Sequence, residues 1–433
     1  MAVWEMAYRA AARGARVAAP LLGRGSSKLA RGVRARAHAV DVLADWAADH
    51  REPSMPLLWI HAPSVGEGLQ ARAVLESVAR LRPGLQTVFT HFSPSAEPLA
   101  GRMPVDVAGY LPWDLPGAMG RTLDALRPSV VAFTKTEVWP TLSREATARG
   151  VATALVAATL PAGSSRLRAP ARWALAPSLR RLSVVAAIAD DDAGRFGSLG
   201  VPAERAVVTG DPGIDSAAQR AAAADPDAPW LRPFRSAPRP TLVAGSTWPT
   251  DEAVLLPAAT RLRETEPRLR LVVAPHEPTP RHLQPLERAL ADAGWAVARL
   301  GAVEEAGDAG GADAVVVDRV GVLAQLYTVG DVAWVGGGFH GQGLHSVLEP
   351  AAAGLPVLFG PRHHNARAAG ELVEAGAARV VGDAPAAVDA LRAWLGDGDA
   401  RLHAGERALR YIGGHRGAAE RTAGHLLGLL DRR

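Results

Sequence analysis

From residue 57 onward, short apolar runs alternate with longer segments in which apolar residues recur at helical spacing. The first run is LLWI, at residues 57–60, and the helical segment EGLQARAVLESVARL follows it closely. Later runs in this first series are TVFTHF, VVAFTK, ATALVAA, VVAAIA and AVVTG. This rhythm is typical of βαβ units and therefore predicts a parallel sheet.

The alternation stops at residues 221–240, where alanine, proline and charged residues predict a linker. A second series then follows, with the runs TLVAGS, LRLVVAP, WAVARL, AVVVD, DVAWVGG, LPVLFG and ARVVG. We therefore expect an α/β protein with two Rossmann-like, doubly wound parallel-sheet domains that face a central cleft. Ligands of such folds bind at the carboxyl ends of the strands. The tail predicts a helix that packs back on the first domain.

Composition is that of a globular protein with more than one domain. The chain has 433 residues, of which 48% are hydrophobic and 21% are charged, and this length favours two or three domains. The absence of cysteine excludes a disulfide framework, thiolate metal sites and a cysteine nucleophile. The net charge of +4 does not argue for a nucleic-acid partner.

The first 50 residues predict a basic amphipathic arm. Residues 9–36 contain eight arginines and lysines and no acidic residue. Charges interrupt each apolar stretch before it reaches the ~18 residues that a membrane-spanning helix needs, and the pattern does not favour a signal peptide. With Trp4 near one end, the segment predicts contact with an anionic membrane surface. A solvated arm is the alternative.

Two glutamates follow predicted strands. Glu67 comes after the turn HAPSVG, at or near the first turn of a helix, where free N–H groups and the helix dipole favour an ionised carboxylate. Glu137 follows the run VVAFT in the same way. Two carboxylates at one rim of a sheet can divide acid, base and electrostatic duties. For each glutamate, helix capping is the alternative.

A glycine run ends another predicted strand in DVAWVGGGFHGQGLHSVLEP. Gly336, Gly337 and Gly338 would let backbone N–H groups approach a ligand, and a helix that opens near Ser346 would favour a phosphate. Glu349, one turn into that helix, is placed to accept hydrogen bonds from ribose hydroxyls. No Walker lysine accompanies the run. A purely structural role for the glycines is the alternative.

Two other polar groups carry weaker signals. Asp190–Asp192 lie at a strand-to-helix turn, where aspartate is a favoured cap, and no spaced carboxylates accompany them to hold a metal. The adjacent histidines of PRHHNA, residues 361–366, point in different directions, which argues against a zinc site. No hydrolase elbow or kinase motif set is present.

The order of these motifs resembles one family, the 3-deoxy-D-manno-octulosonic acid (Kdo) transferases of lipopolysaccharide synthesis, which are glycosyltransferases of the two-domain GT-B fold. The matching segments, between residues 57 and 380, are HAPSVGEG, FTHFSPSA, YLPWDLP, RPSVVAFTKTEVWP, RFGSLG, GSTWPTDE, VVAPHEP, VVVDRVGVLAQLY, VGGGFHGQGLHSVLEP and LFGPRHHNA. The resemblance implies inverting transfer of Kdo from CMP-Kdo to a lipid A precursor, lipid IVA, on the cytoplasmic face of the inner membrane. It also implies that neither a metal nor a cofactor is needed.

The resemblance assigns roles to particular residues. Glu67 matches the general base that takes the proton of the acceptor hydroxyl, and Glu137 matches a second acidic residue that assists at the transition state. The positions that match the binding segments for CMP are Ser246, Thr247, Pro275, His276, Val320, Gly321, Val322, Gly336, Gly337, Gly338, Ser346, Val347, Leu348 and Glu349.

The chain departs from the family's motifs at three positions. His276 stands where an arginine is usual, Gly213 where a basic residue is usual, and Ser346 where an asparagine is usual. One expected cation is therefore missing, and Arg281 or Arg166 could replace it by reaching into the cleft.

The expected organisation has five segments. Residues 1–50 form the membrane-associating arm, 51–225 the acceptor-binding domain, 226–240 the linker, 241–410 the CMP-Kdo-binding domain, and 411–433 a C-terminal helix.

Other interpretations fit the same pattern of elements. One is another GT-B enzyme that acts on a nucleotide sugar, such as a UDP-N-acetylglucosamine epimerase or a lipid A disaccharide synthase. A second is a bilobal binding protein without activity. A third is a degenerate, lipid-binding member of the family, for which the loss of a cation at Gly213 would be one sign. The relative affinity for CMP and UDP separates the first from a Kdo transferase.

Overall fold

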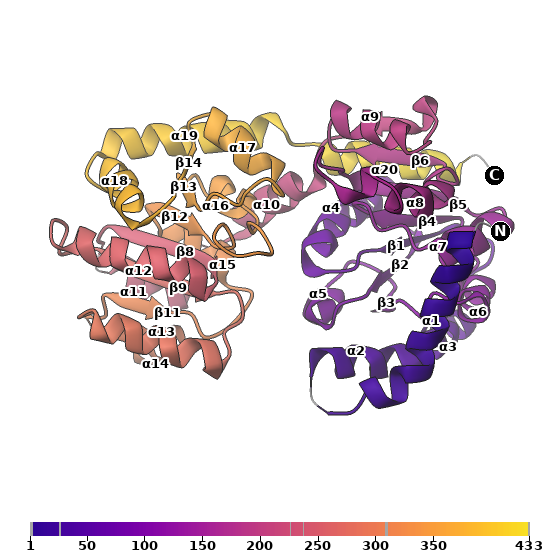
Figure 1. Cartoon of the computed structure of the whole chain (residues 1–433), viewed down its shortest axis with the longest axis horizontal. Coiled ribbons are helices and arrows are strands. Elements are labelled where there is room, and N and C mark those ends of the chain that lie inside the picture. The colour runs from indigo at the N-terminus through magenta and orange to yellow at the C-terminus, as the bar shows by residue number, and fades with distance from the viewer. Residues whose placement is uncertain (1–2, 26, 226, 237, 308–310, 432–433) are drawn as a thin grey trace. The chain divides into compact units, whose positions relative to one another are not determined.

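The computed structural model describes residues 3–25, 27–225, 227–236, 238–307 and 311–431. The chain divides into two compact units, of which the first comprises Met1–Ser216 and Arg416–Arg433 and the second Ala217–His415. Each unit is built on a parallel seven-stranded sheet covered by helices (Figure 1). The prediction of two Rossmann-like α/β domains is therefore confirmed.

The strands of the first unit lie in the order β3-β2-β1-β4-β5-β6-β7. They are β1 (Leu57–His61), β2 (Gln86–His91), β3 (Val107–Tyr110), β4 (Val130–Thr134), β5 (Ala152–Ala158), β6 (Val184–Ala187) and β7 (Ala206–Val208). The helices of this unit are α1 (Val3–Leu22), α2 (Lys28–Ala37), α3 (Ala39–His50), α4 (Val65–Leu81), α5 (Glu97–Ala100), α6 (Pro116–Leu126), α7 (Pro140–Ala148), α8 (Ala171–Leu179), α9 (Asp190–Ser198) and α20 (Ala418–Leu430). Short 3₁₀ turns are η1 (Pro94–Ala96), η2 (Ser165–Leu167) and η3 (Ala203–Arg205).

Both faces of this sheet are buried, which explains why its strands are apolar runs rather than alternating ones. In β1, Leu57 and Trp59 pack into the core on one face, and Leu58 and Ile60 pack into the core on the other. Successive side chains of a strand point to opposite faces, so all four positions must be apolar.

The C-terminal tail returns to the first unit, as the sequence predicted. The Asp215 carboxylate accepts hydrogen bonds from the N–H groups of Gly417, at 2.6 Å, and Ala419, at 2.8 Å. Ala423 and Leu426 of α20 then pack with residues of β1 and α4 in the core. A buried carboxylate thus fixes the start of the last helix.

The N-terminal helices are folded parts of the first unit. Leu43 of α3 packs in the core beside Trp59, and Glu5 of α1 forms an ion pair with Arg181. Among the described helices, none has both the length and the apolar character that crossing a membrane would require.

The strands of the second unit lie in the order β10-β11-β9-β8-β12-β13-β14. They are β8 (Thr241–Thr247), β9 (Arg270–Pro275), β10 (Val297–Arg299), β11 (Ala314–Val316), β12 (Val332–Val335), β13 (Val357–Phe359) and β14 (Ala378–Val380). The helices of this unit are α11 (Arg232–Arg235), α12 (Pro249–Arg263), α13 (Pro280–Asp292), α14 (Leu300–Ala306), α15 (Leu323–Leu326), α16 (Leu348–Ala352), α17 (Arg367–Glu374), α18 (Ala384–Leu395) and α19 (Gly398–Gly414), with 3₁₀ turns η4 (Pro229–Leu231) and η5 (Tyr327–Val329).

The division between the units falls within helix α10 (Pro212–Ala223), between Ser216 and Ala217. Much of the segment that the sequence assigned to a linker is packed into the second unit, because Leu231 and Phe234 lie in its core beside Val243.

Each sheet has a switch point between two neighbouring strands. On the two sides of this point, successive strands of the chain are added to the sheet in opposite directions. In the first unit this point lies between β1 and β4, and in the second unit between β8 and β12. Ligands of parallel α/β sheets bind outside the carboxyl ends of the strands at such points. A ligand of either unit is therefore expected at the loops after these four strands.

Candidate active site

Glu67 lies at the switch point of the first unit, in the first turn of α4, as the sequence predicted. The hydroxyl of Ser64 donates a hydrogen bond to its carboxylate. Burial alone would raise the pKa of Glu67, but the charge of Lys135 and the hydrogen bond from Ser64 outweigh it, and the pKa is lowered. Because its pKa is lowered, the carboxylate is ionised at neutral pH. The side chain is 17% exposed, so it remains within reach of a ligand.

Lys135 follows β4 directly and is the partner that the sequence interpretation missed. Its Nζ lies 3.4 Å from Oε1 of Glu67. The backbone of Lys135 has a φ of 55°, in the left-handed region, and its N–H donates to the Val156 carbonyl at 2.9 Å. One signal was present in the sequence: of 48 basic residues only two, Lys28 and Lys135, are lysines.

Glu137 lies on the same loop as Lys135, between β4 and α7, with its side chain exposed. Partial loss of hydration and the negative charge of Glu67 raise the pKa of Glu137, whereas Arg166 and Lys135 oppose this rise. The structure therefore brings together the two glutamates and Arg166, one of the two arginines considered from the sequence. The two carboxyl groups have their pKa values shifted in opposite directions.

A third carboxyl group, that of Asp211, lies beside Gly213. Its Oδ1 accepts hydrogen bonds from the Gly213 N–H and from Nε2 of Gln70, both at 2.7 Å. Burial raises the pKa of Asp211, and these two hydrogen bonds and the charge of Lys135 counteract it. Although position 213 carries no cation, Lys135 supplies a positive charge to the same region.

In the second unit, Ser246 and Thr247 end β8 at the switch point. Ser246 has a φ of 55°, where the pairing of β8 with β9 is irregular. The hydroxyl of Thr247 donates to Glu252 Oε1 at 2.7 Å, and His282 Nε2 lies 2.9 Å from the same oxygen. This buried network fixes Thr247, Glu252 of α12 and His282 of α13 relative to one another.

The glycine run after β12 is held by Asp251 of α12. The carboxylate accepts hydrogen bonds from the N–H groups of Gly337, at 2.8 Å, Phe339, at 3.1 Å, and Trp248, at 2.9 Å. The Gly337 N–H therefore already has an acceptor within the protein. A bound phosphate is therefore not required as the hydrogen-bond acceptor of the Gly337 N–H.

Close packing accounts for two glycines of the run, and backbone conformation accounts for the third. A Cβ at Gly336 would collide with the carbonyl of Ser246, and one at Gly338 would collide with the backbone of Gly360. Gly337 has a φ of 93°, which side chains rarely allow. The interpretation that these glycines have a structural role thus has a direct physical basis.

Three histidines gather around Trp248. The Trp248 ring stacks on His340, with centroids 4.1 Å apart, and on His276, with centroids 4.7 Å apart. The indole N–H donates to His345 Nε2 at 3.0 Å. Burial and the two neighbouring histidines lower the pKa of His345 to about 4. His345 is therefore neutral at physiological pH and accepts this hydrogen bond.

The segment from Ser346 to Glu349 also lies at this end of the second sheet. The side chains of Val347 and Leu348 are buried, and that of Ser346 is exposed. Glu349 forms an ion pair with Arg220 of α10, a cation that the sequence interpretation missed because the two residues are far apart in the chain.

The remaining donor candidates lie on two loops. Pro275 is buried at the end of β9, and the N–H of His276 after it donates to the Thr247 carbonyl at 2.9 Å. Val320 is exposed and Gly321 has a φ of 88°, just before Val322 caps α15. These loops place the predicted positions at one end of the sheet.

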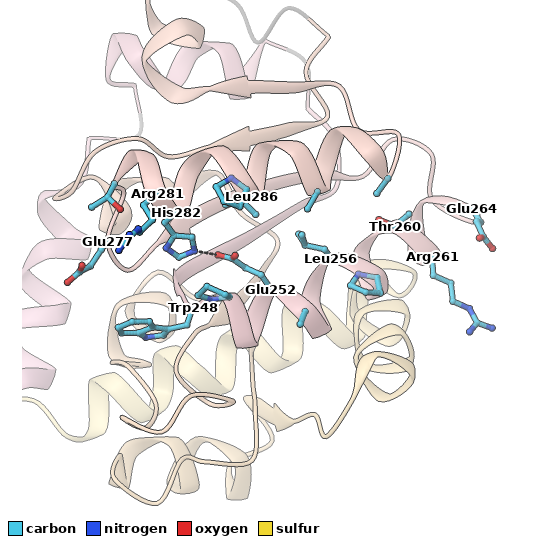
Figure 2. A pocket seen from close by; sticks show the side chains of 17 residues that line it. Trp248, Glu252, Leu256, Thr260, Arg261, Glu264, Glu277, Arg281, His282 and Leu286 are labelled. Atoms are coloured by element: carbon cyan, nitrogen blue, oxygen red, sulfur yellow. Dashed lines mark hydrogen bonds and ion pairs between the residues drawn. The ribbon is translucent and has the colours of Figure 1, made fainter.

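A pocket of about 1130 Å³ lies between α12 and α13. Figure 2 shows Trp248, Glu277 and Arg281 at one end of it, Arg261 and Glu264 at the other, and the contact between Glu252 and His282 between them. Apolar residues line its length, namely Ala253, Leu256, Pro257, Pro285, Leu286, Ala289 and Ala293. Arg281, the second arginine considered from the sequence, thus lies at the pocket end next to Trp248.

The groups that the sequence discounted have structural partners. Asp192 accepts a hydrogen bond from the Leu160 N–H at 2.7 Å, and both Asp191 and Asp192 pair with Arg195. Within the described part of the chain, no cluster of three or more His, Cys, Asp or Glu side chains is arranged to hold a metal ion.

Comparison with known proteins extends these observations. Residues 33–216 match the family model for 3-Deoxy-D-manno-octulosonic-acid transferase (kdotransferase). The 3-deoxy-D-manno-octulosonic acid transferase of Bordetella pertussis is 32% identical over 380 residues, which cover 84% of this chain and 85% of the relative. That of Haemophilus influenzae is 27% identical over 379 residues, covering 87% of each chain.

Solved structures with the same fold include the co-structure of S. aureus MnaA with UDP, with a TM-score of 0.63 and 14% identity over 87% of this chain and 97% of that one. Another is UDP-GlcNAc 2-epimerase from Neisseria meningitidis, with a TM-score of 0.61 and 13% identity over 88% of this chain and 100% of that one. The two units thus have the GT-B class of fold, with two Rossmann-like domains. The chain belongs to the 3-deoxy-D-manno-octulosonic acid transferase family, and it is a glycosyltransferase.

The role of Asp251 gives a first prediction. Asp251→Ala leaves three backbone N–H groups without their acceptor, and each buried unpaired group is worth ~1–3 kcal/mol. We expect the second unit to lose about 3 kcal/mol or more of its free energy of unfolding, measured by hydrogen exchange of its peptides in urea. Glu264→Ala, an exposed residue at the end of the same helix, is the control. Equal stability of both variants would show that Asp251 does not hold the glycine run.

Proposed function

We propose that this chain transfers Kdo from CMP-Kdo to a lipid A precursor, lipid IVA, in the synthesis of the lipopolysaccharide core. The first unit binds the acceptor and supplies the base, and the second unit binds the donor. The observation that carries the proposal is the state of Glu67, which is partly exposed, lies at a switch point and has a lowered pKa. A general base must be ionised before it can accept a proton.

In the proposed reaction, Glu67 accepts the proton of an acceptor hydroxyl. The oxygen of that hydroxyl attacks the anomeric carbon of Kdo, and the bond from this carbon to the phosphate oxygen of CMP breaks. CMP leaves with the bonding electron pair, and a single displacement of this kind inverts the configuration at the carbon. The reaction is proposed to proceed without a metal, as the family resemblance implies.

Glu137 is proposed to assist at the transition state. Its pKa is raised while that of Glu67 is lowered, and carboxyl groups whose pKa values are pushed apart commonly take different roles. Glu137 is exposed on the loop after β4, where it can meet a substrate.

The proposed donor contacts differ in kind. Because the side chains of Val347 and Leu348 are buried, these residues are proposed to contact the nucleotide through backbone atoms. Ser346 is exposed and His276 is partly exposed, so both offer side-chain hydrogen-bond donors to it. Glu349, which forms an ion pair with Arg220, is proposed to accept hydrogen bonds from ribose hydroxyls.

We further propose that α1 rests on the cytoplasmic face of the inner membrane. Trp4 is 42% exposed, Val17 80% and Leu21 64%, and the same helix carries exposed Arg13 and Arg16. Apolar side chains next to basic ones favour the surface of an anionic bilayer.

Incubation with a tetra-acylated lipid A precursor and freshly generated CMP-Kdo tests the proposal directly. Mass spectrometry of the lipid should show an added Kdo, and the mass also gives the number of additions. Titration calorimetry should show that CMP binds and that UDP does not. An unchanged lipid mass, or binding of UDP instead of CMP, would favour another enzyme of the same fold class.

The base gives a second prediction. Glu67→Gln keeps the shape of the side chain but cannot accept the proton, so we expect the rate of transfer to fall by about 10²–10⁴-fold with CMP affinity unchanged. Glu76→Gln, in the same helix and paired with Arg72, is the control and should keep its rate. A rate for the Glu67 variant within about tenfold of the original enzyme would rule out this role.

The membrane contact gives a third prediction. Charge reversal in Arg13→Glu/Arg16→Glu should weaken binding to vesicles that contain anionic lipid, and the difference should shrink as salt screens the charges. Cosedimentation with vesicles measures it. The control Arg288→Glu/Arg410→Glu makes the same change of charge at exposed positions of the second unit. Equal loss of binding in both variants would mean that net charge, and not α1, governs association.

A further inference from the structure

The chain uses lysine at only two of its 48 basic positions. Arginine serves almost everywhere else, including most of the ion pairs of the structure, such as those with Glu5, Glu76 and Glu349. Against this background, the lysine at position 135 differs from the usual arginine in chemistry, although both carry a positive charge. Arginine presents a planar fork suited to two-point binding of a carboxylate, whereas lysine is a compact charge on a flexible stem.

The backbone holds Lys135 in an unusual place. With a φ of 55°, the residue adopts a region that few residues other than glycine occupy. Such conformations persist where the surrounding structure imposes them, and they gather at functional sites. The N–H of Lys135 is tied to the Val156 carbonyl of β5, which fixes the point from which the side chain starts.

The ammonium group lies among carboxyl groups from three elements. Glu67 comes from α4, Glu137 from the loop after β4, and Asp211 from the segment before α10, and the charge of Lys135 acts on the pKa of each. Ser64, Arg166 and Gln70 are further polar partners, acting on Glu67, Glu137 and Asp211 respectively. The Lys135 side chain is 38% exposed, so its charge is also open to a ligand.

The pairing of Lys135 with Glu67 creates a conflict for catalysis. A carboxylate stabilised by a cation is more surely ionised, but it is a weaker acceptor for a proton. A partly exposed ion pair contributes little to stability, so an incoming anion can replace the carboxylate as the partner of the ammonium. The four-carbon stem of lysine allows that movement, which a two-point arginine pair would resist.

We propose that Lys135 is an anion-binding residue of this site, whose ammonium pairs with Glu67 in the free enzyme and with a carboxylate or phosphate of the substrate in the complex. This inference rests on the proposed function, because it assigns a further role within the same site. The exchange leaves Glu67 ionised and free to accept a proton. It also makes activation of the base depend on the arrival of an anionic substrate.

The test compares Lys135→Met with Arg72→Met. The control removes a cation with the same 38% exposure from another ion pair of the first unit, that of Arg72 with Glu76 of α4. For Lys135→Met we expect kcat/KM for transfer to fall about tenfold or more, since hydrogen bonds to charged groups are the strong ones. The acid limb of its pH profile should move to higher pH, because the pKa of Glu67 rises without Lys135 and the base is then protonated at a higher pH. Arg72→Met should change neither.

Lys135→Arg separates charge from shape. It should keep the acid limb near its original position, because the positive charge remains, but with a lower kcat, because a forked guanidinium holds Glu67 more firmly. The proposal would be overturned if Lys135→Met had the same kcat/KM as the original enzyme and the acid limb of its pH profile lay at the same pH.

Binding measurements keep the proposal testable without turnover and identify the anion. Titrations with free Kdo, which offers a carboxylate, and with inorganic phosphate are made on the original protein and on Lys135→Met. Loss of affinity for Kdo alone assigns the carboxylate, and loss for phosphate alone assigns the phosphate. Unchanged affinity for both contradicts the inference even if transfer occurs. Absence of transfer by the original enzyme, with Lys135-dependent anion binding intact, would instead contradict the proposed reaction.

Discussion

The ion pair between Lys135 and Glu67 is the interaction on which the proposed chemistry of the first unit depends. It joins the loops after β1 and β4, the two strands between which the strand order of the first sheet reverses. The sheet brings these loops together, and the first turn of α4 favours a negative charge on Glu67. Fold and electrostatics therefore act in the same direction: both keep a carboxylate ionised where a parallel sheet binds its ligands.

The second unit depends on a different use of a carboxylate. Asp251 ties the glycine run after β12 to the start of α12, and Glu252 beside it holds Thr247 and His282. Two neighbouring acidic residues thus organise the loops at the switch point of this sheet. This arrangement makes the glycines necessary for close backbone packing, and it leaves the polar groups around them as the candidates for contacts with the proposed donor.

Much of the fold could be predicted from the sequence, because buried parallel strands are apolar runs of a recognisable length. The place of Glu67 in a first helical turn followed from the same pattern. Contacts between distant segments could not be predicted in this way: no periodicity links Lys135 to Glu67, or Arg220 to Glu349. The glycine run shows a related difficulty, because glycine suits both close approach of a ligand and close packing of the backbone. The hydrogen bonds of Asp251, which the sequence does not reveal, favour the packing role.

Direct observation of the Lys135 ammonium tests the central claim most closely. With two lysines in the chain, labelling lysine side chains for NMR should give two signals, and Lys28→Arg assigns them. The Lys135 signal should shift as the pH falls, with a midpoint below the usual pKa of a glutamate because the pKa of Glu67 is lowered, and Glu67→Gln should remove that shift. A Lys135 signal that titrates in the same way with and without the Glu67 carboxylate would contradict the account.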